Sequence, residues 1–285
     1  MKRYTSYKIV AAPLLALAVF AAACGSIPPA ETGADASQSK SEEARLPNGY
    51  TLRRSTSSVP LAEKQTRDDP RLNISFIFLE PKKPDREAEF LKGLLYSGNS
   101  AKQYQNALAG EYQDMYRQDP PEAVSGSLPA DWEYRENLAV RGMGESGVTL
   151  ARKKYVYTGG THGMQTTTYY VIDREALTVL KLPDFFRDPQ GAELRALVME
   201  ELRLYSGLEP DRPLSEGIFF RDEPEISSNF FVTEEGLGLH WNPYDIAPYS
   251  EGSVEITLPW RTLRPLLKQE AMERLTKFGI NLFVS

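Results

Sequence analysis

Apolar and polar residues alternate along several short segments, which is the pattern of strands with one buried face. Residues 72–79 alternate at first and then become wholly apolar, so we expect a strand buried on one or both faces. Residues 132–140 and 148–157 flank a glycine-rich turn and predict an antiparallel hairpin, and residues 165–172 predict a third strand. Further short strands are expected at residues 230–232, 237–241 and 253–258.

Three other segments carry apolar residues at every third or fourth position, which predicts amphipathic helices. Residues 86–116 predict two helices, or one kinked helix, because Gly98 and Asn99 interrupt the pattern. We interpret the tyrosines of this segment as core packing. Residues 187–206 predict a helix that ends at Gly207, and residues 260–277 predict a closing helix.

Strands and helices occur in blocks and do not alternate, which favours an α+β fold with antiparallel sheets and segregated helices. From residue 51 onward the chain is long enough for one large or two modest domains. We expect two small α+β subdomains, at residues 51–140 and 141–285.

The first 50 residues have the composition of a targeting segment and a tether. Basic residues precede an uncharged apolar run at residues 9–23, which is shorter than the ~20 residues of a membrane-spanning helix. Residues 1–23 are therefore predicted to be a signal peptide. Residues 24–50 are predicted to be a disordered tether, because Ser, Ala, Glu, Gly and Pro offer little apolar surface to bury.

Cys24 is the only cysteine of the 285 residues, so it cannot form an intramolecular disulfide. The small residues before it resemble a bacterial lipobox, although Ala21 stands where leucine is more typical. This resemblance implies that Cys24 becomes the lipidated N-terminus and that membrane lipid is a partner. Gly25, in place of Asp, indicates the outer membrane by the usual sorting pattern. The alternative is an ordinary signal peptide with an incidental cysteine.

Charge and histidine content exclude several kinds of site. A formal net charge of −6 argues against a nucleic-acid partner, which would need a basic face. With two histidines and one cysteine, thiolate zinc sites and two-histidine zinc motifs lack ligands. The one set of metal ligands that the composition still allows combines His162, His240 and a carboxylate such as Asp245. We predict no metal and no other cofactor.

The sequence has no Gly-x-Ser-x-Gly motif and no reactive thiol, so it offers no recognisable nucleophile. Asp245 and Glu251 lie in one loop and would suit the acid–base work of a cell-wall glycan hydrolase. Among 39 acids, however, such pairs are common. We therefore predict a protein that is not an enzyme and assign no catalytic residue. A hydrolase and a structural envelope lipoprotein remain the alternatives.

Two loops are rich in residues that constrain the backbone. Residues 241–252 contain two prolines, two tyrosines, two acids and a closing glycine, so their path is largely fixed. They form either a structural corner or a recognition surface, and we expect Tyr244 or Tyr249 to be buried. In the glycine-rich segment 158–163, His162 is expected to donate to a carbonyl and pin the loop.

Residues 155–163 and 239–252 together resemble the paired signatures of a bacterial envelope domain of unknown function, the DUF3298 type. That domain occurs in the lysozyme-sensing anti-sigma factor RsiV and beside peptidoglycan deacetylases. The resemblance covers about residues 152–267. Residues 61–136 are more weakly similar to the DUF4163-type domain that often precedes it.

The resemblance implies an α+β envelope domain that binds lysozyme in one branch of the family. This sequence shows no sigma-binding segment and no deacetylase ligands, so we expect the binding module alone on a lipid anchor. We predict a lipid-anchored binding or sensor protein of the cell envelope, whose partner is a protein such as lysozyme or a peptidoglycan fragment. The candidate binding residues are Gly159, Gly160, His162, Gly163, Pro243, Tyr244, Asp245, Pro248 and Tyr249.

Overall fold

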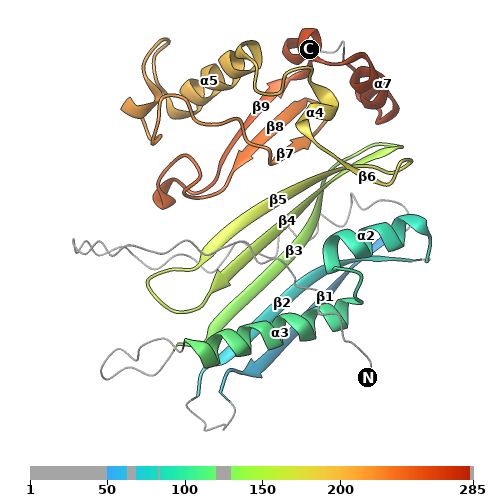
Figure 1. Ribbon diagram of the computed structural model, residues 1–285, viewed down its shortest axis with the longest axis vertical. Helices are drawn as coiled ribbons and strands as arrows, with labels where there is room; N and C mark the ends of the chain where they lie inside the picture. Colours follow the sequence, from blue (N-terminus) through green and yellow to red (C-terminus); the bar gives the residue numbers. More distant parts are fainter. Residues whose placement is uncertain (1–49, 63–68, 83, 120–129, 283–285) are drawn as a thin grey trace, which may run out of the picture.

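The computed structural model describes residues 50–62, 69–82, 84–119 and 130–282 (Figure 1). The predicted signal peptide, Cys24 and all but the last residue of the predicted tether lie outside these ranges. Among the helices in these ranges, none is both long and apolar enough to cross a membrane.

The larger sheet has its six strands in chain order. They are β1 (Tyr50–Pro60), β2 (Arg71–Pro81), β3 (Trp132–Met143), β4 (Gly147–Tyr157), β5 (Met164–Asp173) and β6 (Thr178–Leu180). The predicted hairpin of β3 and β4 is confirmed, as is the strand β5 beside it. Residues 140 and 141, between which the sequence placed a subdomain boundary, both lie within β3.

One strand pair departs from the antiparallel sheet that the sequence predicts, because β2 and β3 run parallel. Between them the chain forms α2 (Arg86–Tyr96) and α3 (Ala101–Gln118), which carry it back to the starting end of the sheet. Parallel neighbours require such a crossover. The α+β class is confirmed, but this part of the chain is a β-α-β unit.

Two helices, and not one kinked helix, follow β2. Asp85 caps α2 by accepting from the Ala88 N–H at 2.8 Å, and Ser97 ends it in the left-handed conformation. Ser100 and Gln103 form a capping box that starts α3. The tyrosines of α3 pack against the hydrophobic cluster under the sheet, as predicted.

A buried polar network fixes α3 to the sheet. Arg152 of β4 makes a two-pronged ion pair with Glu136 of β3, at 2.8 and 3.0 Å. The Tyr134 hydroxyl donates to the same carboxylate at 2.5 Å, and Tyr104 of α3 adds a further hydroxyl at 3.4 Å. Burial, followed by the charge of Glu136, raises the pKa of Tyr104 to about 12.

The second half of the chain builds a three-stranded antiparallel sheet with helices on its far side (Figure 1). Its strands, all three predicted, are β7 (Phe230–Val232), β8 (Gly236–Trp241) and β9 (Val254–Pro259). Its helices are α4 (Leu182–Phe185), α5 (Ala192–Ser206), α6 (Trp260–Leu263) and α7 (Gln269–Lys277), with the 3-10 turns η2 (Leu214–Glu216), η3 (Tyr249–Glu251) and η4 (Arg264–Leu266).

The predicted closing helix is divided into α6, η4 and α7. Pro265 lies in η4, where its ring removes a backbone donor and interrupts the helical hydrogen bonds. In the other predicted helix, α5 begins at Ala192 and not at residue 187, because residues 188–191 form a turn closed by the Gly191 N–H on the Asp188 carbonyl. The predicted end at Gly207 is confirmed, with φ 69°.

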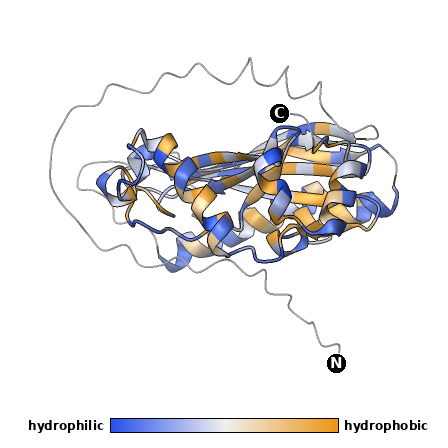
Figure 2. Ribbon diagram, turned by 90° about the horizontal axis from the view of Figure 1, so that it is seen from above, coloured by the Kyte–Doolittle hydropathy of each residue, from blue (hydrophilic) through white to orange (hydrophobic). Residues whose placement is uncertain are grey.

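The two sheets stack closely where β7 meets β3 and β4. A side chain at Gly142 would place its Cβ 2.4 Å from the Val232 carbonyl oxygen, so only glycine fits there. The Thr149 hydroxyl donates to that oxygen at 3.0 Å and accepts from the Val232 N–H at 3.3 Å. Hydrophobic clusters fill the space under α2 and α3 and the space between the smaller sheet and α5. The helices carry both hydrophobic and hydrophilic residues, as covering helices do (Figure 2).

Candidate functional site

The two loops singled out in the sequence meet in the structure. The rings of His162 and Tyr249 stack with their centroids 4.0 Å apart and their planes 17° apart. The Tyr249 hydroxyl donates to the Gly163 carbonyl at 2.6 Å, and the His162 Nδ1 lies 3.1 Å from the same oxygen. The 158–163 loop between β4 and β5 is therefore joined to the 242–252 loop between β8 and β9.

Tyr244 continues this stack outward. Its ring centroid lies 5.5 Å from that of Tyr249, and half of its surface is exposed. Its backbone has a φ of 73°, a region that costs a non-glycine residue about 1 kcal/mol or more. We call Tyr244, Tyr249 and His162 the aromatic platform. The expectation that Tyr244 or Tyr249 would be buried is wrong, because Tyr244 is exposed and Tyr249 is only half-buried.

The remaining candidates of the 242–252 loop hold its shape. The Asp245 carboxylate accepts from the Asn242 N–H at 2.8 Å and so closes the turn. Pro243 is buried, whereas Asp245 and Pro248 are exposed. Gly252 has a φ of 70°, which allows the chain to enter β9.

The glycines of the 158–163 loop are required by the backbone conformation and by close packing. Gly159 and Gly160 adopt φ values of 99° and 91°, and the Tyr157 hydroxyl donates to the Gly160 carbonyl at 3.1 Å. At Gly163 an added Cβ would lie 2.4 Å from the Tyr155 ring. His162 pins this loop through a carbonyl, as predicted, while its ring stays exposed.

Two asparagines that the sequence analysis did not select join the platform to the scaffold. The Asn229 side chain accepts from the Tyr169 N–H at 2.8 Å and donates to the Thr167 carbonyl at 2.7 Å. The Asn242 Oδ1 accepts from the Thr167 N–H at 2.6 Å. Both amides thus bind backbone groups of β5 with which no strand in the described ranges pairs. An asparagine in a connecting segment gives no sequence signal for this role.

His240 lies buried below the platform, in a different environment from His162. Its Nδ1 is 3.3 Å from Glu255 Oε2, and its Nε2 is 3.3 Å from Asn242 Oδ1. Glu255 also accepts from the Tyr169 hydroxyl at 3.0 Å and from Arg141. Burial raises the pKa of Glu255, but the hydrogen bond from His240 and the charge of Arg141 outweigh it and lower the pKa.

Metal ligands do not converge in the described ranges, since no group of three or more His, Cys, Asp and Glu residues there could hold an ion. His162 lies on the platform, and His240 is enclosed by Glu255 and Asn242.

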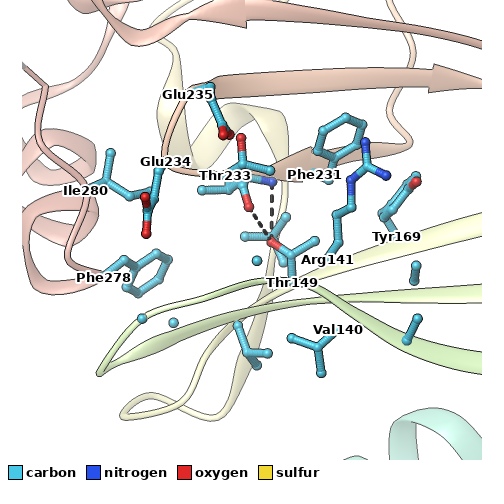
Figure 3. Close-up of a pocket in the computed structure, with 18 of the residues that line it drawn as sticks. Val140, Arg141, Thr149, Tyr169, Phe231, Thr233, Glu234, Glu235, Phe278 and Ile280 are labelled. Atoms are coloured by element: carbon cyan, nitrogen blue, oxygen red, sulfur yellow. Dashed lines mark hydrogen bonds between the residues drawn. The ribbon is translucent and has the colours of Figure 1, made fainter. Parts of the chain in front are cut away.

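A cavity of about 1380 Å³ lies between the two sheets (Figure 3). The Arg141 guanidinium lies 4.7 Å from the Phe231 ring centroid at one side, and Phe278 and Ile280 line the other. None of the candidate binding residues lines it. This cavity was not predictable from the sequence, because the strands that bound it include β3 and β7, which are distant in sequence.

Fold and site together define an α+β protein of two stacked sheets, in which two distant loops combine into one exposed aromatic surface. Residues 183–261 match the model of a family described as Protein of unknown function (DUF3298). The match includes the 242–252 loop but not the 158–163 loop. No curated protein matches the chain.

Two solved structures share the fold. A member of the DUF3298 family from Bacteroides fragilis NCTC 9343 has a TM-score of 0.66 and 21% identity, and the alignment covers 78% of this chain and 94% of that chain. A DUF3298 family protein from Pseudomonas aeruginosa PAO1 has a TM-score of 0.55 and 20% identity, with 79% and 97% covered.

Proposed function

We propose that the chain is a non-catalytic binding or sensor protein of the cell envelope, attached to the outer membrane by lipid on Cys24. Its ligand, a peptidoglycan fragment or a protein such as lysozyme, binds on the aromatic platform. The observation that supports this proposal is the exposed stack of Tyr244, Tyr249 and His162, built by two loops and fixed by the Tyr249 hydrogen bond.

The exposed Tyr244 suits binding, because it presents a large rigid face and a polar tip at little cost in side-chain entropy. The platform needs no rearrangement to accept a ligand, since Tyr249 is already held by Gly163 and His162. A strained backbone at Tyr244 is consistent with a ring that is kept outward for a partner.

The proposal includes two finer resemblances. We propose that the part of the chain matched by the DUF3298 model has an envelope role of the kind seen in RsiV, and that residues 51–140 form a DUF4163-type subdomain. Under this proposal the chain works as two subdomains, 51–140 and 141–285, although both contribute strands to one sheet.

The test is a calorimetric titration of residues 24–285 carrying Cys24→Ser, so that no lipid is attached. Soluble muropeptides and lysozyme are the titrants. We expect one of them to bind, and Tyr244→Ala to weaken binding at least about tenfold, as loss of an interface anchor does. Tyr205→Ala is the matched control, because Tyr205 is a similarly exposed tyrosine on α5. Failure of both titrants to bind, or unchanged binding by Tyr244→Ala, contradicts the proposal.

The alternative of a cell-wall hydrolase rests on Asp245 and Glu251, which are both exposed. Its test is muropeptide release from purified peptidoglycan, and release that is lost in Asp245→Asn or Glu251→Gln supports it. A structural lipoprotein is the other alternative, in which Tyr249→Ala lowers stability and no ligand binds.

A further inference from the structure

The faces of the larger sheet are covered unequally by the described elements. Helices α2 and α3 lie on one face, and the smaller sheet stacks on the other through contacts of β7 with β3 and β5 (Figure 1). The strand register places a further set of side chains on that second face, beyond the smaller sheet. We call it the open face, formed by Arg54, Ser75, Arg135, Asn137, Lys153 and Tyr155.

The open face is continuous with the aromatic platform. The Tyr155 ring packs directly against Gly163, whose carbonyl holds the Tyr249 hydroxyl. Gln165, opposite Tyr155 on β5, is exposed at the same margin. A ligand on the platform that extends over Gly163 therefore reaches Tyr155 and then β3.

The open face carries several basic side chains together with one acidic residue, Glu133, which lies two positions before Arg135 on β3. Arg54, Arg135 and Lys153 are exposed basic residues on it, in a protein of net charge −6. The Arg135 guanidinium lies over the Tyr155 ring at 4.4 Å. Its ion pair with Glu133, at 3.1 Å, is between side chains that are both about half exposed, so a carboxylate of a ligand can replace Glu133.

We propose that the open face extends the platform into a binding site for a glycan that carries carboxylate groups, an inference that rests on the proposed function. A sugar ring lies on the exposed Tyr244 ring, the amides of Asn137 and Gln165 bind hydroxyl groups, and Arg135 and Lys153 pair with the carboxylates. Guanidinium and ammonium groups bind carboxylates by charge-assisted hydrogen bonds. The open face places a few basic side chains among amides and aromatic rings. Such a surface matches a glycan with few carboxylates better than a polyanion with many.

The test compares two tetrasaccharides with the same β-1,4 backbone, using residues 24–285 with Cys24→Ser. Tetra-N-acetylchitotetraose, called chitotetraose below, is neutral, whereas the alternating N-acetylglucosamine–N-acetylmuramic acid tetrasaccharide carries two lactyl carboxylates. We expect the acidic tetrasaccharide to bind about tenfold more tightly, and this preference to shrink with added salt. The double variant Arg135→Gln, Lys153→Gln should lose the preference and still bind chitotetraose.

The matched control is Arg261→Gln, Lys277→Gln, which removes the same charge from α6 and α7 and should keep the preference. Circular dichroism melting confirms that each variant is folded. Equal binding of the two glycans by the wild type overturns this inference and leaves the proposed function standing. Equally tight binding of hexaglutamate overturns the glycan class. If only lysozyme binds, this inference fails alone, and if no titrant binds, the proposed function fails with it.

Discussion

Tyr249 combines two contacts in one side chain, a ring stacked on His162 and a hydroxyl bound to the Gly163 carbonyl. The ring contributes surface to the platform, and the hydroxyl joins two loops that lie 86 residues apart in sequence. Because the two contacts use different atoms, conservative substitution can separate them.

Tyr249→Phe keeps the ring and removes the hydroxyl. We expect the free energy of unfolding to fall by about 1 kcal/mol, the usual contribution of one hydrogen bond, while the platform keeps its ring. Urea denaturation measures this, with Tyr205→Phe on the exposed surface of α5 as the control. A Tyr249→Phe protein as stable as the wild type would show that the loops are held together by other contacts.

Glu255 gives the protein a specific dependence on acid. Its pKa is lowered from the ordinary value of 4.5, against the effect of burial, by His240, Arg141 and Tyr169. A carboxyl group with a lowered folded-state pKa stabilises the fold above its ordinary pKa and loses that effect as the pH falls through the lowered value. Glu255→Gln should therefore flatten the decrease in stability below about pH 4.5.

The measurement is the urea midpoint at several pH values for the wild type and Glu255→Gln. Glu251→Gln, an exposed acid in the same β8–β9 connection, is the control and should follow the wild type. Parallel curves for the wild type and Glu255→Gln would mean that the Glu255 contacts do not persist in solution.

At the scale of elements, the asparagines replace a neighbouring strand along part of β5. β6 pairs only with residues 171–173, so among the described strands none lies beside the earlier part of β5 on that side. The side chains of Asn229 and Asn242 supply the missing hydrogen bonds and attach the larger sheet to the segments around β8.

Asn229→Ala should leave the Tyr169 N–H and the Thr167 carbonyl without partners. We expect a loss of about 1–3 kcal/mol in the free energy of unfolding, and faster hydrogen exchange at the Tyr169 amide. Asn106→Ala, an exposed asparagine within α3, is the control and should cost nothing, because alanine favours helices. Unchanged exchange at Tyr169 in Asn229→Ala would contradict this role.

Strands with a regular apolar pattern over many residues were predictable from sequence, and several short or irregular elements were not. β2, β4 and β5 follow hydrophobic patterns, and each lies where the pattern placed it. β1 was missed, because its Arg, Ser and Thr side chains show no apolar alternation at the sheet edge. The parallel pairing of β2 with β3 depends on where α2 and α3 lead the chain, which a local pattern does not contain.

The site was predictable only in part. Unusual composition identified both loops, but their contact through Tyr249 and Gly163 is a long-range property of the fold. The outward direction of Tyr244 follows from a positive φ that no sequence rule assigns to tyrosine. Open-face residues such as Arg135 come together only through strand register, so the sequence could not group them.

At the scale of the whole molecule, the proposed function requires attachment to a membrane. Cys24→Ser should abolish labelling of the protein by radioactive palmitate. Ser26→Ala, a small change two residues further on, is the control and should keep the label. Labelling that persists in Cys24→Ser would exclude a lipid anchor on this residue.

The amide-covered edge of β5 has a consequence for self-association. Exposed strand edges are templates on which other chains add strands and aggregate. On β5 that template is already occupied by Asn229 and Asn242. The opposite edge of the sheet is β1. Arg53 and Arg54 place two exposed charges on this strand, with which a strand of another chain would have to pair. Both borders of the larger sheet thus oppose the addition of strands from other copies of the chain.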